Sequence, residues 1–300
     1  MKKLLFVINP HSGMGIIKNK ILEIIDIFTS NDYEVTIYTT KCHNDAYEKI
    51  CRDGTRFDLV VCSGGDGTLN EAVSALMQLP APPCLGYIPS GTVNDFASNL
   101  KIPKNMLAAA KNIMEGSVFQ CDVGAFNEQY FTYIAAFGAY TEISYETSQD
   151  IKNIIGRGAY FIETLKHLGP LKSYKIKITL PDGRVIRDSF AYGMVTNSNT
   201  IAGFRGFKPK PIDLNDGIFD AIFIKNPTNP IAFQSIANDF LMGIKQSTDY
   251  IYCFETSQVT IESEEPLSWT LDGEFGGYHT KADIKNLHSA LKIKTVYTPS

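Results

Sequence analysis

The sequence predicts an α/β fold in two parts: an N-terminal three-layer α/β domain and a C-terminal, mainly antiparallel β-sandwich domain. Three observations predict it. The 300 residues suffice for two domains of ordinary size. Strand-like and helix-like segments alternate up to about residue 123, as in a parallel sheet with crossover helices. Strand-like segments dominate beyond that point, and a hydrophobic content of 44% allows each part its own core.

Apolar spacing and end signals define the elements of the first part. Short apolar or alternating runs rich in β-branched residues predict strands over 4–9, 33–40, 57–62 and 84–89. Helical spacing predicts helices over 16–28, 44–54 and 68–78. Asn44 and Gly54 are the start and stop signals of the second of these helices. The alternation of the two types favours one sheet of parallel strands.

The second part is expected to be mainly strands. Strand-like stretches cover 129–140, 173–197, 217–225, 249–263 and 291–299, and helical stretches cover about 147–168 and 230–246. A hairpin turn is expected at Asp182-Gly183. We expect the last strand to return to the first domain, which gives a first domain of 1–123 plus 288–300 and a second of 124–287.

Composition narrows the function classes. The net charge of -4 argues against a nucleic-acid partner, because such proteins usually carry a basic surface. None of the six cysteines forms a CxxC pair or has zinc-ligand spacing, so reduced thiols in a cytoplasmic protein are expected. The apolar run from Leu4 to Ile8 is too short for a signal peptide, and no run approaches a membrane span. The expectation is a soluble protein.

Three glycine-bearing loops follow expected strands and precede expected helices. They read NPHSGMG from Asn9 to Gly15, SGGDGT from Ser63 to Thr68 and PSGTVNDFA from Pro89 to Ala97. Parallel strands end at one edge of a sheet, so the loops should converge where open α/β sheets bind ligands. Backbone N–H groups at a helix start attract phosphate, and glycine permits its close approach. A plain turn is the alternative for the first loop alone.

Asp66 adds a carboxylate to the second loop. A lone carboxylate repels a triphosphate unless a magnesium ion lies between them. The alternative is a helix-capping aspartate in a tight turn, but such a turn does not need Gly64, Gly65 and Gly67 together. The loop therefore favours magnesium-bound phosphate.

The sequence GGDGTLNE, from Gly64 to Glu71, resembles the diacylglycerol kinase catalytic-domain family, together with NPHSG before it and PSGTVNDFA after it. DLNDGIFD from Asp213 and LDGE ending at Glu274 extend the resemblance over nearly the whole chain. This family includes bacterial soluble lipid kinases, sphingosine kinases and ceramide kinases. The resemblance implies phosphorylation of a lipid hydroxyl by ATP with magnesium.

The resemblance also implies roles for individual residues. Glu274 would be the general base, with Asp66 and Asp272 as further catalytic residues. The nucleotide would be held by Asn9, Pro10, His11, Ser12, Gly13, Thr40, Gly64, Gly65, Asp66, Gly67, Thr68, Leu69, Asn70, Glu71, Ser90, Gly91, Thr92, Asn94 and Asp95. A structural magnesium would be held by Asp213, Asp216 and Ile218, and many members have a second acidic residue where this chain has Asn215.

Diacylglycerol is the expected acceptor, which would give phosphatidic acid, while phosphatidylglycerol, a sphingoid base and a polyprenol stay open. Two other functions stay open as well. An NAD kinase shares GGDGT but phosphorylates a soluble ribose, and an inactive scaffold would bind lipid or nucleotide without transfer. A nucleic-acid partner is not expected. Beyond the lipid alcohol, the expected partners are a second copy of the chain in a homodimer and, through a transient contact, the inner face of the membrane. The loop over 203–211, with two phenylalanines and three basic residues, is one candidate for that contact.

Overall fold

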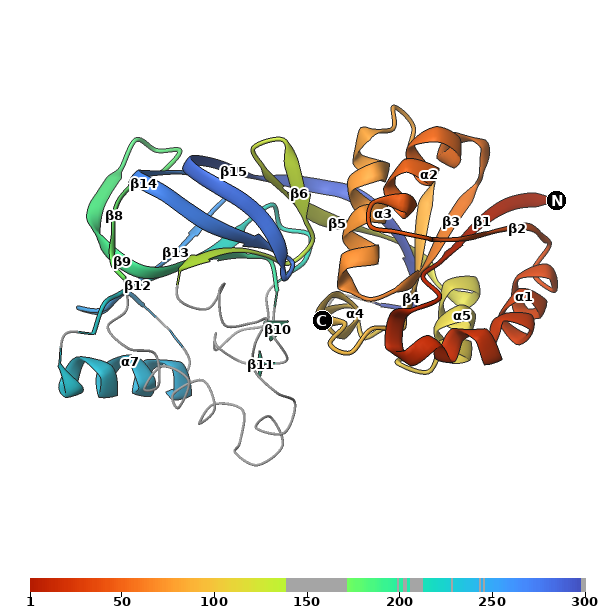
Figure 1. Ribbon diagram of the computed structural model, residues 1–300, viewed down its shortest axis with the longest axis horizontal. Coiled ribbons are helices and arrows are strands. Elements are labelled where there is room, and N and C mark those ends of the chain that lie inside the picture. The colour runs from red at the N-terminus through yellow and green to blue at the C-terminus, as the bar shows by residue number, and fades with distance from the viewer. Residues whose placement is uncertain are drawn as a thin grey trace.

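The computed structural model describes residues 1–138, 172–198, 200–201, 204–205, 213–227, 229–242, 244 and 246–297. Figure 1 shows two lobes: an α/β lobe that begins the chain, coloured red to yellow, and a β-rich lobe, coloured mainly green to blue. The predicted fold class is therefore confirmed. No helix of the described residues is long and apolar enough to cross a membrane.

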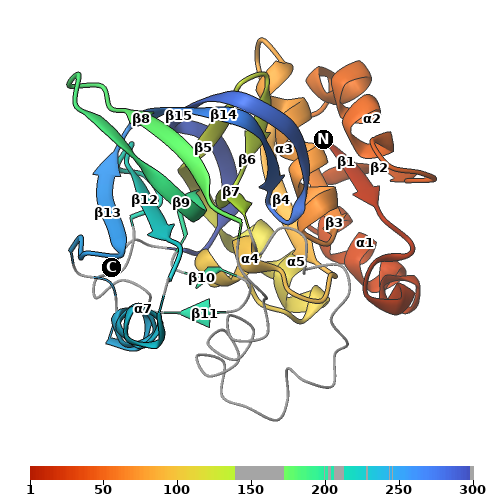
Figure 2. The same cartoon turned by 60° about the vertical axis from the view of Figure 1, so that its left-hand side comes forward.

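Four parallel strands form the sheet of the α/β lobe. They are β1 (Lys2–Ile8), β2 (Tyr33–Thr39), β3 (Leu59–Gly64) and β4 (Cys84–Pro89), in the spatial order β2-β1-β3-β4. The helices α1 (Ile21–Thr29) and α5 (Met106–Glu115) pack together on one face of this sheet. The helices α2 (Asp45–Asp53) and α3 (Asp66–Gln78) pack together on the other face (Figure 2), which gives the predicted three layers. A short helix, α4 (Asp95–Asn99), follows β4.

The helix predicted over 16–28 is wrong in its first part, and one helix was missed. A 3-10 helix covers Ser12–Asn19, and α1 begins only at Ile21. Gly13 and Gly15 have positive φ angles of 55° and 71°, which α-helical residues do not adopt, so the chain begins this stretch in tighter turns. The missed helix α5 has a sequence signal, because the side chain of Asn105 accepts hydrogen bonds from the N–H groups of Leu107 and Ala108.

Antiparallel strands form the β-rich lobe. They are β6 (Gln129–Phe131), β7 (Ile134–Gly138), β8 (Tyr174–Thr179), β9 (Val185–Thr196), β12 (Phe219–Lys225), β13 (Ile251–Thr256) and β14 (Gln258–Leu271), with a separate short pair, β10 (Thr200–Ile201) and β11 (Phe204–Arg205). The hairpin predicted at Asp182-Gly183 joins β8 and β9. The helix predicted over 230–246 is α7 (Pro230–Met242), whereas the helix predicted over 147–168 lies outside the described residues.

Two long strands connect the lobes. β5 (Ser117–Phe126) pairs antiparallel along most of its length with the second half of β15 (Glu274–Thr295). The first half of β15 pairs with β14, and Ile293 near its end pairs parallel with Leu85 of β4. The expected return of the last strand to the α/β lobe is therefore confirmed. Because both strands continue across the boundaries near 123 and 287, the exact domain division stays a prediction.

Each lobe has its own cluster of buried hydrophobic residues. Leu4–Ile8 of β1 lie at the centre of the cluster in the α/β lobe, between its two helix layers. Trp269 is fully enclosed in the β-rich lobe, where its ring packs against Phe126 and Phe137 with centroid distances of 4.8 and 5.0 Å. The two strands that connect the lobes contribute residues to both clusters. β15 is therefore packed into both hydrophobic cores, and its first residue is Glu274.

Candidate active site

The three glycine loops meet at the carboxyl ends of β1, β3 and β4, as expected. A Cβ atom added to Gly13 would lie 1.9 Å from the carbonyl oxygen of Ser90, so the first loop touches the third. A Cβ added to Gly91 would lie 2.6 Å from Cα of Gly65, so the third loop touches the second. The N–H of Ser90 also donates to the carbonyl of Gly64 at 2.8 Å. Side chains at these glycines would force the loops apart.

Helix α3 begins among these loops without a side-chain cap. Its N-cap residue, Gly65, is extended and has no side chain to accept a hydrogen bond. The first backbone N–H groups of a helix have no partner within the helix, and the helix dipole adds positive charge there. Asn9 lines the same end, with its Nδ2 donating to Oγ1 of Thr68 at 3.0 Å. This end of α3 can therefore accept an anion such as phosphate.

Asp66 is largely buried and incompletely satisfied. Its Oδ2 accepts a long hydrogen bond of 3.4 Å from the N–H of Asp95, while its buried Oδ1 has no partner among the described residues. Burial, the carboxylate of Asp95 and that of Asp272 raise the pKa of Asp66 to about 6. The buried hydroxyls of Ser63 and Ser90 also lack partners within the described chain. Polar atoms of this kind, gathered where three loops meet, fit a bound polar group.

Glu274 lies against the start of α3. It is the first residue of β15, directly after a turn in which Asp272 and Gly273 have positive φ angles of 50° and 88°. A Cβ added to Gly67 would lie 2.8 Å from Oε1 of Glu274, so the carboxylate sits beside the residue that follows Asp66. The carboxylate of Glu274 is exposed and makes no hydrogen bond within the described chain. It is available to a substrate.

Asp272 fixes the turn that presents Glu274. Its carboxylate is only 3% exposed and accepts five hydrogen bonds of 2.6–3.1 Å, from three backbone N–H groups over 132–134, the hydroxyl of Thr132 and Nδ2 of Asn70. Burial raises the pKa of Asp272, and these hydrogen bonds oppose that rise. With both oxygens engaged, Asp272 has the geometry of a positioning residue. Because Asn70 belongs to α3, its hydrogen bond also ties the turn at Asp272 to that helix.

Replacing Asp272 by Asn should therefore destabilise the protein and impair catalysis. The amide NH₂ of asparagine would face the N–H and O–H groups that now donate to Asp272, so some of these buried donors would lose their acceptor. We therefore expect the free energy of unfolding to fall by about 3 kcal/mol. The turn at Gly273 would loosen and Glu274 would move. Urea unfolding and turnover would both be measured. Unchanged stability would show that the observed hydrogen-bond network does not hold the turn.

Other predicted nucleotide residues divide into loop residues and structural ones. Pro10, His11 and Ser12 lie in the first loop, Thr92 is exposed in the third, and Thr40 follows β2, with its N–H donating to Ile8. Leu69 is fully buried in the core. Glu71 caps α2, because its two oxygens accept from the N–H groups of Asn44 and Ala46 at 2.9 and 3.2 Å. Asn94 closes the third loop through hydrogen bonds with Gly91 in both directions.

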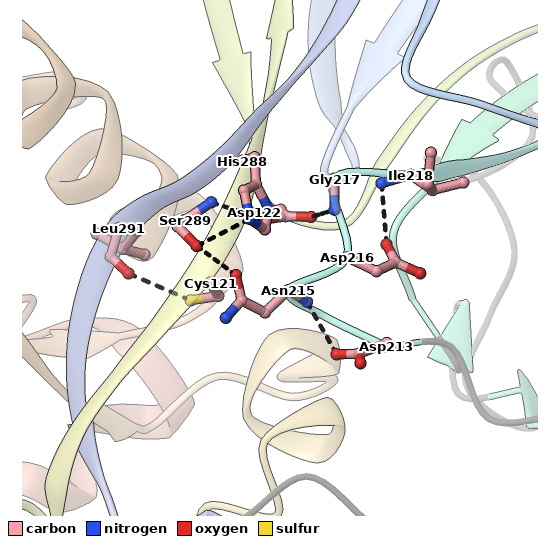
Figure 3. A network of polar contacts seen from close by, with 10 residues as sticks. All are labelled: Cys121, Asp122, Asp213, Asn215, Asp216, Gly217, Ile218, His288, Ser289 and Leu291. Atoms are coloured by element: carbon pink, nitrogen blue, oxygen red, sulfur yellow. Dashed lines mark hydrogen bonds and ion pairs between the residues drawn. The ribbon is translucent and has the colours of Figure 1, made fainter.

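The predicted metal residues lie in the loop before β12, beside the bulge of β15 (Figure 3). Oδ1 of Asp213 accepts from the N–H of Asn215, and Oδ1 of Asp216 accepts from the N–H of Ile218. Partial burial and the carboxylates of Asp213 and Asp122 raise the pKa of Asp216. In the part of the chain that the structure describes, no group of three or more His, Cys, Asp or Glu side chains is arranged to hold a metal ion. The oxygen donors suit magnesium, but a closed set of ligands is not formed.

Sequence reasoning missed the residue that anchors this loop. Asp122, a buried carboxylate in β5, accepts hydrogen bonds from the N–H groups of Gly217 and Ser289 and contacts Nδ1 of His288 at 3.0 Å (Figure 3). The hydroxyl of Ser289 donates to Oδ1 of Asn215 at 2.5 Å. An aspartate inside the apolar strand CDVGAF was the available signal, since buried carboxylates need partners. The loop is therefore held to both connecting strands.

Replacing Gly67 by Ala should impair catalysis without unfolding the protein. The new Cβ would displace the flexible carboxylate of Glu274, and a misplacement of about 1 Å can lower turnover by about 10²-fold. Alanine is also favoured over glycine within a helix by about 1 kcal/mol, so thermal stability should be equal or higher. Paired measurements of kcat and Tm would check this. Wild-type turnover would show that the contact with Glu274 is irrelevant to catalysis.

Comparison with known proteins identifies relatives along the whole chain. The family model described as the diacylglycerol kinase catalytic domain matches residues 3–126. A diacylglycerol kinase of Bacillus subtilis (strain 168) is 34% identical over 279 residues, which cover 92% of this chain and 91% of that protein. A diacylglycerol kinase of Staphylococcus aureus (strain Newman) is 32% identical over 293 residues, which cover 97% of this chain and 92% of that protein.

Solved structures share the same fold. A crystal structure of a diacylglycerol kinase from Bacillus anthracis str. Sterne matches with a TM-score of 0.78 and 25% identity, covering 99% of this chain and 97% of that one. A second crystal structure from that organism matches with a TM-score of 0.84 and 27% identity over the same shares. Because each match covers 99% of this chain, the likeness includes both lobes.

Proposed function

The chain belongs to the diacylglycerol kinase catalytic-domain family and is a lipid kinase, and we propose that it transfers the γ-phosphoryl group of ATP to the hydroxyl of diacylglycerol at the inner face of the membrane. One observation carries the proposal. The carboxylate of Glu274 lies beside Gly67, at the uncapped start of α3 where three glycine loops meet. A phosphate-accepting helix end and an available base thus share one location.

The three loops would hold the nucleotide. The uncapped N–H groups at the start of α3 and the backbone of Gly13 and Gly91 offer donors and close approach to phosphate oxygens. Asp66 fits a magnesium ion, because its orphaned oxygen is a hard donor. Burial and the carboxylates of Asp95 and Asp272 raise its pKa, and a bound cation would offset that cost of ionisation. Magnesium, when bound, neutralises charge on the phosphoryl oxygens during transfer. Asp95 lies beside Asp66 and would strengthen the same interaction.

Glu274 would orient and deprotonate the acceptor. Phosphoryl transfer depends on positioning and on charge stabilisation, and the acceptor hydroxyl needs a group to take its proton. That proton would pass to an Oε atom of Glu274 as the bond to phosphorus forms. Asp272 would hold the turn so that this oxygen keeps its distance from α3. A carboxylate suits the task because the proton leaves mainly as the transition state develops.

A structural magnesium at Asp213, Asp216 and the carbonyl of Ile218 would stabilise the β12 loop. Magnesium usually keeps several waters, so two carboxylates can suffice. Adding magnesium without nucleotide should raise Tm by about 2–4 °C, as expected for a ligand at roughly ten times its Kd. Asp216→Asn should lose this rise, while Asp66→Asn should keep it. An equal rise in all three proteins would contradict the assignment.

Incubation with labelled ATP and a panel of acceptors tests the function. The panel contains diacylglycerol, phosphatidylglycerol, a sphingoid base, a polyprenol and NAD, and products are identified by mass spectrometry. We expect phosphatidic acid to dominate. Phosphorylated NAD would support the soluble-ribose alternative instead. Nucleotide binding without transfer to any acceptor would support an inactive scaffold.

A further inference from the structure

Two exposed aromatic rings follow Glu274 directly. Phe275 is 58% exposed and Tyr278 is 69% exposed, although neither lies in a loop. Their rings contact each other edge to face with a centroid distance of 5.3 Å. Scattered exposed apolar residues are ordinary, but a paired Phe and Tyr beside a candidate catalytic carboxylate is a specific arrangement.

A β-bulge places both rings on one side of the strand. Alternate residues of a regular strand point to opposite faces, so residues 275 and 278 would not share a face. Trp269 pairs with Gly277 and Thr270 pairs with Phe275, which leaves Gly276 as an extra residue in β15. A Cβ on Gly276 would lie 2.8 Å from Cγ of Leu271, and Gly277 has a φ of 98°. Glycines therefore permit the bulge that brings the rings together.

Phe275 also continues a row of side chains on one face of the sheet that ends in the apolar core. Phe275 pairs with Thr270, Thr270 with Ala136, and Ala136 with Met194, so these four side chains share one face. Ala136 and Met194 are buried in the cluster that includes Ile236 of α7. Phe275 is thus the solvent-exposed end of a row whose inner residues, Ala136 and Met194, are buried and apolar, and the half-buried Thr270 lies between Phe275 and these inner residues. Only one charged side chain, that of Glu274, is exposed between residues 270 and 278.

We propose that Phe275 and Tyr278 dock the enzyme on the bilayer that contains its lipid substrate. This rests on the proposed function. The hydroxyl of a diglyceride lies at the level of the lipid headgroups, so the base must reach that level. Phe275 is adjacent to Glu274, and rings with an apolar body and a polar tip, such as tyrosine, favour the membrane interface. Insertion of the pair would bring Glu274 to the depth of the hydroxyl.

Vesicle binding by the double variant Phe275→Ser with Tyr278→Ser tests the proposal. The vesicles contain phosphatidylglycerol, phosphatidylcholine and dioleoylglycerol, and binding is measured by co-sedimentation. Removing two rings that insertion into the bilayer would bury should weaken binding by about 10²-fold, at roughly tenfold per ring. Leu22→Ser removes an apolar side chain that is 78% exposed on α1, and this matched control should bind like the wild type.

Turnover separates docking from chemistry. With a water-soluble short-chain diglyceride the double variant should match the wild type, whereas with vesicles its KM should rise. Equal vesicle affinity of variant and wild type would overturn the docking proposal alone. If the double variant loses self-association but binds vesicles like the wild type, the aromatic pair would instead contact a second copy of the chain. If the wild type phosphorylates neither form of diglyceride, the proposed function fails instead.

A tryptophan reporter gives a direct reading of insertion. The chain has one tryptophan, Trp269, which is 1% exposed and gives a background that vesicles should not change. In Phe275→Trp the new side chain should shift its emission to the blue when vesicles are added, and brominated lipids should quench it. An emission spectrum that vesicles leave unchanged would contradict insertion.

Discussion

Glu274→Gln is expected to lower kcat by about 10²–10⁴-fold, the usual contribution of a general base. Glutamine keeps the size of the side chain and the turn at Gly273, but it cannot accept the proton of the acceptor hydroxyl. The carboxylate is exposed and makes no hydrogen bond within the described chain, so the free energy of unfolding should not change. Steady-state turnover of a soluble diglyceride, with urea unfolding in parallel, would measure both.

A matched control is available on the neighbouring strand. Glu264 of β14 is also exposed and forms only a surface ion pair with Lys175, so Glu264→Gln should keep wild-type turnover. ATP affinity of Glu274→Gln should also match the wild type, because the loops that would hold the nucleotide stay intact. Turnover within twofold of the wild type would remove Glu274 from the mechanism.

Asp66→Asn should lower kcat/KM by about 10³-fold and at the same time stabilise the protein without nucleotide. The loss of activity follows if the carboxylate holds a metal ion, since metal stabilisation of the transition state contributes several kcal/mol. The gain in stability follows from the raised pKa. Folding raises the pKa of Asp66 from 3.8 to about 6, so ionising this carboxyl group costs more in the folded protein than in the unfolded chain. At pH 8 the ionised carboxylate therefore destabilises the wild type by about 3 kcal/mol.

The pH dependence distinguishes this effect from a simple change in packing. The folded pKa of Asp66, about 6, lies above the unfolded value of 3.8, so the stability linked to its protonation is present below pH 3.8 and is lost as pH rises through 6. The advantage of Asp66→Asn in Tm should therefore grow from pH 4 to pH 7 and then level off. Saturating magnesium and nucleotide should reduce it, because a bound cation favours the ionised form. A difference in Tm that does not vary with pH would contradict the raised pKa.

The sequence predicted the features that depend on local patterns. Apolar runs identified β1, β3 and β4, and the glycines after them identified three loops whose backbones would have to approach one another. The parallel order of those strands then placed the loops at one edge. The metal-binding role of Asp66 was favoured over helix capping because a tight turn does not need three glycines, and this role stays a prediction.

Other features depend on contacts between residues far apart in the chain. The five hydrogen bonds to Asp272 come from residues 132–134 and 70, so the sequence could show a turn but not its anchoring. Glu71 belonged to the recognised motif, but capping of α2 could be seen only once α2 and α3 were packed together. The bulge at Gly276 depends on its register with β14, which two adjacent glycines alone do not define.

The start of α3, its three loops and Glu274 are expected to form one catalytic site. A crystal structure with magnesium and a non-hydrolysable ATP analogue tests this most directly. We expect the phosphate chain at the uncapped N–H groups after Gly65, the metal ion on Asp66, and the terminal phosphate on the side of α3 where Glu274 lies beside Gly67. A nucleotide bound at any other edge of the sheet, or with its terminal phosphate directed away from Glu274, would show that these residues do not form one site.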